Sequence, residues 1–528
     1  MFSGNLSEIG KASARSSFHL FLGQASSTLI MAATAVMVGR LLGPEKYGVY
    51  TVALTVPSLL ILFLDLGISS ALVRFVAKLC SDDRSGEAAS LARVGVLFKV
   101  SASAGISLLA YLLSQQIATG FLGRPDATFF VTIAVLYLPG QAVLQTVSSV
   151  YIGLDRADIS SYLMNVQAVS KAIISVALVI VGWGVVGALL GAGLGAVLAS
   201  GVGILFMWKV LPRSGHTVDN NSTLFEGLGP MLSYGFPIYL SALLVGLLPQ
   251  YYGLVLARFV SDLEIGNYST TVNFSAITSL VTVPVSTALF PAFSKLSVRK
   301  SRESVEKMFR LSVKYTSLIV VPTAVALVLF SREVVYALYG ASFEFAPGYL
   351  SLYALNFLNT VLGSIVLGNF FSGQGETRAV FKVGVVTFFL SIFTAPVLVS
   401  LFRVPGLMVS MLISGLVSAF FSLLLCRRMY GVNIDFSSSF KILLSSIIAA
   451  FPVIVFNRLI PISDPLAKLA MGGLIYLGVY LLIAPVIGAV GEEDVRNLRE
   501  MTDGISVIRP LISRVLRLEA GIVNLVKR

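Results

Sequence analysis

Long apolar runs constrain this chain more than any other feature of its sequence. A helix needs about 20 apolar residues to cross a bilayer, and it satisfies its own backbone hydrogen bonds where no water is available. Such runs leave no room for a soluble domain, so the sequence predicts an all-α integral membrane protein with 14 transmembrane helices. The predicted spans are 17–39, 48–72, 94–114, 128–150, 161–181, 185–207, 232–256, 267–290, 312–331, 347–369, 380–401, 405–426, 441–457 and 467–489.

The composition agrees with a membrane protein and excludes several other classes. Only 12% of the 528 residues are charged, against about 25% in soluble domains. We attribute the net charge of +12 to contact with anionic lipids on the inner leaflet, because no folded basic module for nucleic acid is visible. Cys80 and Cys426 cannot form a disulfide framework, and no P-loop pattern occurs. We expect no metal site, no cofactor and no nucleic-acid partner.

Lysine and arginine predict the orientation. With the amino terminus inside, 29 of the 38 cationic residues fall on the inner side and 8 on the outer side. Cytoplasmic loops carry such an excess of positive charge. We therefore expect a multi-pass protein of the cell membrane (plasma or inner) with both termini in the cytoplasm.

An internal repeat divides the chain. The stretch 41–53 returns in weakened form at 263–272, and later matches keep offsets between 217 and 222. A fixed period marks a duplication. Each repeat holds six helices, an even number, so both have the same topology and their pseudo-twofold axis runs along the membrane normal. The residues matched at an offset of 218 are Gly48 with Gly266, Tyr50 with Tyr268, and Arg40 with Arg258.

The repeat predicts a domain organisation. Two equivalent six-helix lobes enclose a central cleft, and rocking one lobe against the other opens that cleft to each side in turn. The sequence thus predicts a transporter. Its parts are an N-lobe at 1–211, a cytoplasmic linker at 212–230, a C-lobe at 231–430, two appended helices at 431–490 and a cytoplasmic amphipathic tail at 491–528.

Lys171 is the least expected residue of any predicted span. It lies near the midplane, where an ammonium costs several kcal/mol without water or a partner. Gln167 lies one turn before it on the same helix face, which predicts a protein interior or an aqueous cavity on that side. The alternative is a structural lysine bonded to backbone carbonyls or to Asp65. Asp65 is the one acidic residue in the predicted spans, and we interpret it as a coupling residue or an ion-pair partner.

Other polar residues extend the candidate site. Gln24 and Asn273 lie in predicted spans, whereas Arg40 and Arg258 lie at outer helix ends. For the two arginines the alternative is a side chain that reaches to the membrane interface, and we expect the same of Lys99 at an inner end.

Glycines recur in the sixth predicted span at small-xxx-small spacing. Gly187, Gly191 and Gly195 share one helix face. Small residues permit close approach of helix backbones in membranes. We therefore expect this face to pack against a neighbouring helix.

Several motifs together resemble a known family. They are GRLLGPEKYGVYTVALTVPSLLILFLDLGISSALVRFVAKL from Gly39, the related turns GLDRA and GETRA, and LYGASFEFAPGYL. With the count of twelve plus two helices, they resemble the polysaccharide-transporter branch of the multidrug, oligosaccharidyl-lipid and polysaccharide exporter superfamily. The resemblance implies a flippase that moves a polyprenyl- or dolichyl-linked oligosaccharide from the inner to the outer leaflet for surface polysaccharide or glycan synthesis. It also implies glycan-assembly enzymes as partners, besides membrane lipids.

The family uses cations in its cleft for lipid phosphate or acidic sugars, and Lys171, Arg40 and Arg258 are the positions that could match. The chemistry of the cargo agrees, because lysine binds phosphate, while Gln24, Gln167 and Asn273 suit sugar hydroxyls.

Two other functions remain open from the sequence. A cation-coupled drug or small-molecule antiporter of the same superfamily would need buried carboxylates, and the predicted spans offer only Asp65. A membrane glycosyltransferase or polymerase would need acid/base or metal-binding groups near the outer surface, where the loops are short and lack histidine. We therefore expect no catalytic residues and no enzyme activity.

Overall fold

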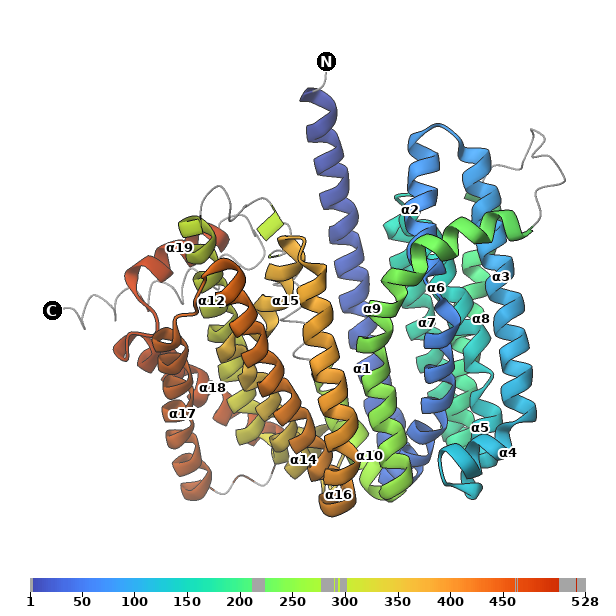
Figure 1. The fold of residues 1–528 in the computed structure, drawn as a ribbon. Coiled ribbons are helices and arrows are strands. Elements are labelled where there is room, and N and C mark those ends of the chain that lie inside the picture. The colour runs from blue at the N-terminus through green and yellow to red at the C-terminus, as the bar shows by residue number, and fades with distance from the viewer. Residues whose placement is uncertain are drawn as a thin grey trace. The chain divides into compact units, whose positions relative to one another are not determined.

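The computed structural model describes residues 3–210, 224–276, 289, 293–294, 302–460, 462, 464–502 and 519. Every regular element within these ranges is a helix, which confirms the all-α prediction for them (Figure 1). The chain forms two compact units. Unit 1 contains residues 1–276 and 391–407, and unit 2 contains 277–390 and 408–528.

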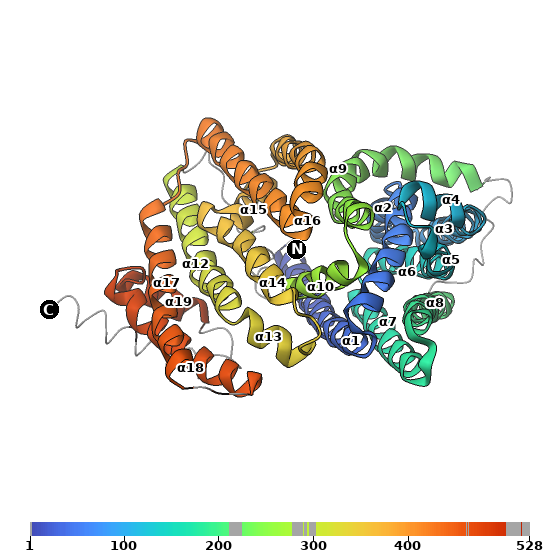
Figure 2. The same cartoon turned by 90° about the horizontal axis from the view of Figure 1, so that it is seen from below.

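Unit 1 is a helical bundle in which small residues allow close packing. Figures 1 and 2 show α7 and α8 side by side. A Cβ on Gly195 would lie 2.8 Å from the backbone nitrogen of Lys171, and one on Gly191 would overlap Ser175. The predicted packing role of this glycine face is confirmed. The elements are α1 (Ser3–Asp65), α2 (Ile68–Ser81), α3 (Ser85–Leu112), α4 (Ser114–Gln116), η1 (Ile117–Phe121), η2 (Pro125–Ala127), α5 (Thr128–Ala134), α6 (Tyr137–Gly153), α7 (Ala157–Leu178), η3 (Val179–Trp183), α8 (Gly184–Val210), α9 (Leu224–Phe259) and α10 (Asp262–Asn273).

Unit 2 has an aromatic core. The Phe370 ring packs edge-on against Phe293 and Phe309, with centroids 5.3 and 5.2 Å apart. In Figures 1 and 2, α17 and α18 lie side by side, as expected for the appended pair. The elements are α12 (Arg302–Leu329), α13 (Ser331–Leu338), α14 (Ala346–Ala354), η4 (Leu355–Leu362), α15 (Ser364–Gly373), α16 (Thr377–Tyr430), α17 (Phe436–Leu459), α18 (Pro465–Val486) and α19 (Glu492–Thr502), and the 391–407 part of α16 belongs to unit 1.

Within the described ranges, nine helices are long and apolar enough to cross a membrane, or ten if the bent pair at 346–373 is one span. Three of them contain 44, 53 and 54 residues, about twice what one crossing needs. Two of these three helices are hairpins. Gly187 contacts Leu178 in one, and Gly406 contacts Leu398 in the other, although a straight helix would hold each pair about 12 Å apart or more. The breaks fall between predicted spans, at Gly182 and Arg403.

Some predictions concern residues outside the described ranges. These are most of the eighth span (267–290), most of the linker (212–230) and most of the tail (491–528). The number fourteen therefore stays a prediction. So do the lobe boundaries, because the compact units divide the chain differently: α9 and α10, which belong to the second repeat, pack in unit 1.

Candidate functional site

Lys171 lies on α7 inside unit 1 and is half-buried. Its charge interacts with the Tyr137 hydroxyl of α6. Tyr137 also interacts electrostatically with Tyr50 of α1, whose ring stacks on Tyr47 with centroids 5.8 Å apart. The Tyr47 hydroxyl accepts a hydrogen bond from Asn273 Nδ2 of α10 at 2.9 Å. We call these five residues the lysine–tyrosine cluster.

Among the described residues, no carboxylate pairs with the lysine of this cluster. Within the described ranges, Tyr137 is the one titratable side chain that interacts with the Lys171 ammonium, and no ion pair forms there. A neutral phenol compensates a cation less well than a carboxylate does. The cluster therefore places an ammonium near one phenol hydroxyl and without a carboxylate, a combination suited to an anionic ligand.

A second polar layer lies one helical turn away. Gln167 Nε2 donates a hydrogen bond to Gln141 Oε1, from α7 to α6. Gln141 follows Tyr137 by four residues, and Gln167 precedes Lys171 by four. The two helices therefore meet through two stacked polar pairs, and Gln167 is 7% exposed.

Gln24 lies at a different contact, between α1 and α7. It is exposed, and its neighbour Gly23 packs against Ser161. Asn165 Nδ2 donates to the Gly23 carbonyl at 3.1 Å, and Ser26 Oγ donates to Asn165 Oδ1 at 2.8 Å. Asn165 was not predicted, although it lies in the fifth span beside Gln167.

Asp65 forms an ion pair with Lys99, not with Lys171. Lys99 Nζ lies 3.1 Å from Asp65 Oδ1 and donates to the Leu64 carbonyl at 3.0 Å. The helix breaks directly after Asp65, at Leu66 and Gly67, both with positive φ, and a break leaves carbonyl groups without a helical partner. The lysine satisfies one of them.

The expectation for Lys99 was wrong. We expected it at an inner helix end with its ammonium at the interface, yet it is 1% exposed. Its position inside the predicted span 94–114 was the signal that could have revealed it. Among the described residues, no cluster of acidic, histidine or cysteine side chains could hold a metal ion.

The two repeats touch at a pair of matched glycines. A Cβ on Gly48 would overlap the Asp262 carbonyl oxygen, and a Cβ on Gly266 would overlap the Pro44 carbonyl oxygen. The repeat relates the two contacts to each other, since the offset of 218 matches Gly48 with Gly266 and Pro44 with Asp262. The contact is therefore reciprocal, as in an isologous interface.

Hydrogen bonds and ion pairs of two arginines stabilise the same region. Arg124 Nε donates to the Ala257 carbonyl at 2.5 Å, and the other guanidinium nitrogens bond to Asp262 and to the Val260 carbonyl. Arg403 Nη1 donates to Glu264 Oε2 at 2.7 Å. The predicted residues Arg40 and Arg258 are exposed and do not join the lysine–tyrosine cluster. Neither Arg124 nor Arg403 was predicted as a site residue.

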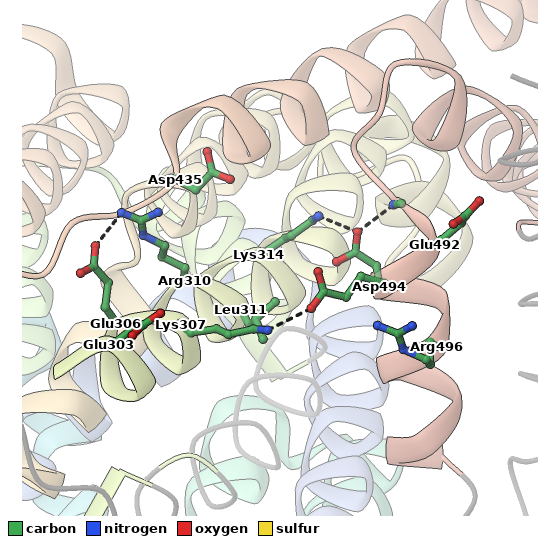
Figure 3. A pocket seen from close by; sticks show the side chains of 12 residues that line it. Glu303, Glu306, Lys307, Arg310, Leu311, Lys314, Asp435, Glu492, Asp494 and Arg496 are labelled. Carbon is green, nitrogen blue, oxygen red and sulfur yellow. Dashed lines mark hydrogen bonds and ion pairs between the residues drawn. The ribbon is translucent and has the colours of Figure 1, made fainter. Parts of the chain in front are cut away.

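A charged cavity of about 810 Å³ lies in unit 2 between α12 and α19. Figure 3 shows Lys314 pointing toward Asp494, with a separation of 2.6 Å. Lys307 pairs with Glu493 at 3.0 Å, and its hydrogen bond lowers the pKa of that carboxyl below the ordinary value. Both lysines are thus paired within the protein, and these two ion pairs hold α19 against α12.

Comparisons with known proteins identify relatives. A family model described as "Polysaccharide biosynthesis protein" matches residues 13–297. The probable low-salt glycan biosynthesis flippase Agl15 of Haloferax volcanii is 22% identical over 46% of this chain and 51% of its own length. The succinoglycan biosynthesis transport protein ExoT of Rhizobium meliloti is 24% identical over 61% of this chain and 62% of its own length. The chain thus aligns with between half and two thirds of these two relatives.

Solved structures with the same fold are membrane transporters. The lipid II flippase MurJ in an inward closed conformation superposes with a TM-score of 0.72 at 14% identity, covering 88% of this chain and 98% of the other. A multidrug resistance transporter of the MATE family in an inward-facing conformation gives 0.62 at 17% identity, covering 77% of this chain and 94% of the other. The chain therefore has the fold of multi-span membrane transporters.

Proposed function

Because the chain belongs to the polysaccharide biosynthesis protein family, we propose that it is a flippase for a polyprenyl- or dolichyl-linked oligosaccharide. It carries the lipid-linked sugar from the inner to the outer leaflet by alternating access. The single observation that carries this proposal is the half-buried Lys171 without an acidic partner in the lysine–tyrosine cluster.

The cargo explains the residue types of the cluster. A lipid-linked sugar has a phosphate and many hydroxyls, which must cross an apolar slab. In this mechanism Lys171 binds the phosphate as a point charge, while Gln167, Asn273 and Gln24 bond to sugar hydroxyls. Arg40 and Arg258 act later, as cations at the outer end of the path.

The proposed transport cycle needs two lobes with the same topology. We assign 14 helices, two six-helix lobes with a pseudo-twofold axis along the membrane normal, and cytoplasmic termini. The reciprocal contact between Gly48 and Gly266 supports this axis, because two copies of one element meet there through equivalent residues. The ion pair of Arg124 with Asp262 closes the outer end until the lobes rock apart.

The antiporter alternative draws support from the fold that the chain shares with MATE transporters. Coupling to a cation gradient needs a carboxylate that is free to bind the cation. Asp65 is already bonded to Lys99 and Ser69, which makes it a poorer coupling site and favours the flippase.

Reconstitution tests the proposal. Proteoliposomes receive a fluorescent polyprenyl-diphosphate oligosaccharide in the inner leaflet, and an impermeant quencher reports its arrival in the outer leaflet. We expect the protein to accelerate the transfer over protein-free liposomes. A cationic dye in the same vesicles, with a proton or sodium gradient, tests the alternative. Dye efflux that dissipates the gradient, without lipid transfer, would replace the flippase by an antiporter.

A further inference from the structure

A broken helix in unit 2 creates a second polar site. The segment from α14 to α15 bends by 48° between Leu362 and Ser364. The hinge residue Gly363 has a φ of 73°, a conformation that favours glycine. Before the hinge the chain is a 3₁₀-helix of eight residues, and after it α15 begins with backbone N–H groups that have no helical partner.

A cavity of about 360 Å³ opens beside this break. Its wall comes from η4, α15 and α16, all within unit 2. Among the described residues that line the cavity, none carries a charge. Its polar members are Asn356, Asn359, Ser364, Thr387, Ser418 and Ser422.

Of the two amides in the lining, Asn359 is the one that forms no hydrogen bond among the described residues. It is 7% exposed, whereas the other amide, Asn356, donates to the Tyr353 carbonyl at 3.2 Å. Thr387 and Ser418 bond to each other at 2.8 Å. Gly415 leaves space for the Asn359 side chain, because a Cβ at position 415 would lie 2.6 Å from Asn359 Nδ2. The amide can therefore take its hydrogen-bond partners from a ligand in the cavity.

We propose that this cavity binds one neutral sugar ring of the lipid-linked saccharide, which rests on the flippase function proposed above. A sugar offers hydroxyls that both donate and accept, and the Asn359 amide needs both kinds of partner. A phosphate or carboxylate would require a cation, and the lining has none. The Phe371 ring adds an apolar wall for the C–H face of a sugar. The volume lies at the small end of the range for ligand pockets, as one ring requires.

Two leucine substitutions provide a matched test. A Cβ on Gly368, which lines the cavity, meets nothing within 4 Å, and the same holds for Gly384 of α16, which does not line it. Gly368→Leu therefore fills the cavity without removing a hydrogen bond, while Gly384→Leu places the same side chain elsewhere. Asn359→Leu removes the unpartnered amide.

Binding is measured with methyl β-D-glucoside as the probe. Wild-type protein in nanodiscs, free of glycoside detergents, should give saturation-transfer NMR signals on the ring protons. Gly368→Leu and Asn359→Leu should lose these signals, and Gly384→Leu should keep them. Equal signals in both glycine variants, or none in the wild type, would overturn the sugar site. Sodium-dependent chemical shifts of the protein without sugar signals would also overturn the sugar site, and they would indicate a cation site instead.

Transport separates this inference from the proposed function. We expect Gly368→Leu to slow transfer of the oligosaccharide lipid about tenfold relative to Gly384→Leu, while transfer of the polyprenyl diphosphate without sugar stays equal in both. If wild-type protein transfers neither lipid, the flippase function fails. If it transfers the oligosaccharide lipid and Gly368→Leu does so at the same rate, the sugar site alone fails.

Discussion

Two lysines in unit 1 have opposite surroundings. Lys99 is 1% exposed and bonds to Asp65 and to the Leu64 carbonyl. Lys171 is half-buried, and Tyr137 is the one titratable neighbour of its charge within the described ranges. Both residues lie in apolar helices that are long enough to span a membrane.

The difference separates a structural cation from the cation that we propose binds the substrate. Lys99 uses its hydrogen bonds to hold a helix break, so it has little capacity left for a ligand. The Lys171 ammonium can still bond to a ligand. The free-energy cost of an uncompensated ammonium in an apolar span falls when an anion binds to it.

The largest effect is expected for the stability of Lys99→Met. The change leaves Asp65 without its cation, and breaking a buried ion pair costs about 3–5 kcal/mol. Thermal unfolding in detergent should show a strongly lowered midpoint. The double variant Asp65→Asn with Lys99→Met should recover part of the loss, because no charge then remains unpaired. A stable Lys99→Met protein would mean that this pair does not hold the helix break.

Lys171→Met should show the reverse pattern. We expect lipid transfer to fall about a hundredfold, equivalent to about 2.7 kcal/mol, with an unchanged unfolding midpoint. Lys171→Arg should retain part of the activity because it keeps the charge. The exposed Lys78, changed to methionine, is the control and should transport normally. Wild-type transfer by Lys171→Met would remove this lysine from the substrate path.

Tyr137→Phe should have a smaller effect on transport. It deletes the hydroxyl that interacts electrostatically with Lys171 and keeps the ring, and we expect a loss of the size of one polar interaction, about 0.5–1.5 kcal/mol. Transfer should slow about fivefold. Tyr151→Phe serves as the comparison, because its hydroxyl donates to the Gly203 carbonyl away from the cluster. A larger loss of transport in Tyr151→Phe than in Tyr137→Phe would argue against the cluster.

The smallest effect is expected at the exposed arginines. Arg40→Gln and Arg258→Gln should each slow transfer about two- to threefold at low salt, and the difference should shrink at high salt, since exposed charges are screened. A salt-independent loss as large as that of Lys171→Met would show that an arginine binds the phosphate in a dehydrated site.

Local sequence features predicted much of the fold. The apolar runs predicted helices, and the turns between spans five and six and between spans eleven and twelve were found at Gly182 and Arg403. The glycine face of α8 packs as its spacing indicated. The partners of the charges could not be predicted in this way. Nothing in the spacing of Asp65, Lys99 and Lys171 tells which lysine the carboxylate meets, because that depends on how helices distant in sequence pack.

Residue type and periodicity along the chain are enough to establish the all-α membrane class, and they predict the positions of the spans and of the repeat. The packing of helices distant in sequence determines that Lys99 neutralises Asp65, that the Lys171 charge interacts with the Tyr137 hydroxyl, and that Gly48 and Gly266 meet reciprocally. The physical reason is the short range of hydrogen bonds and ion pairs. Their energies depend on distances of a few ångströms between helices, which no pattern within one helix specifies.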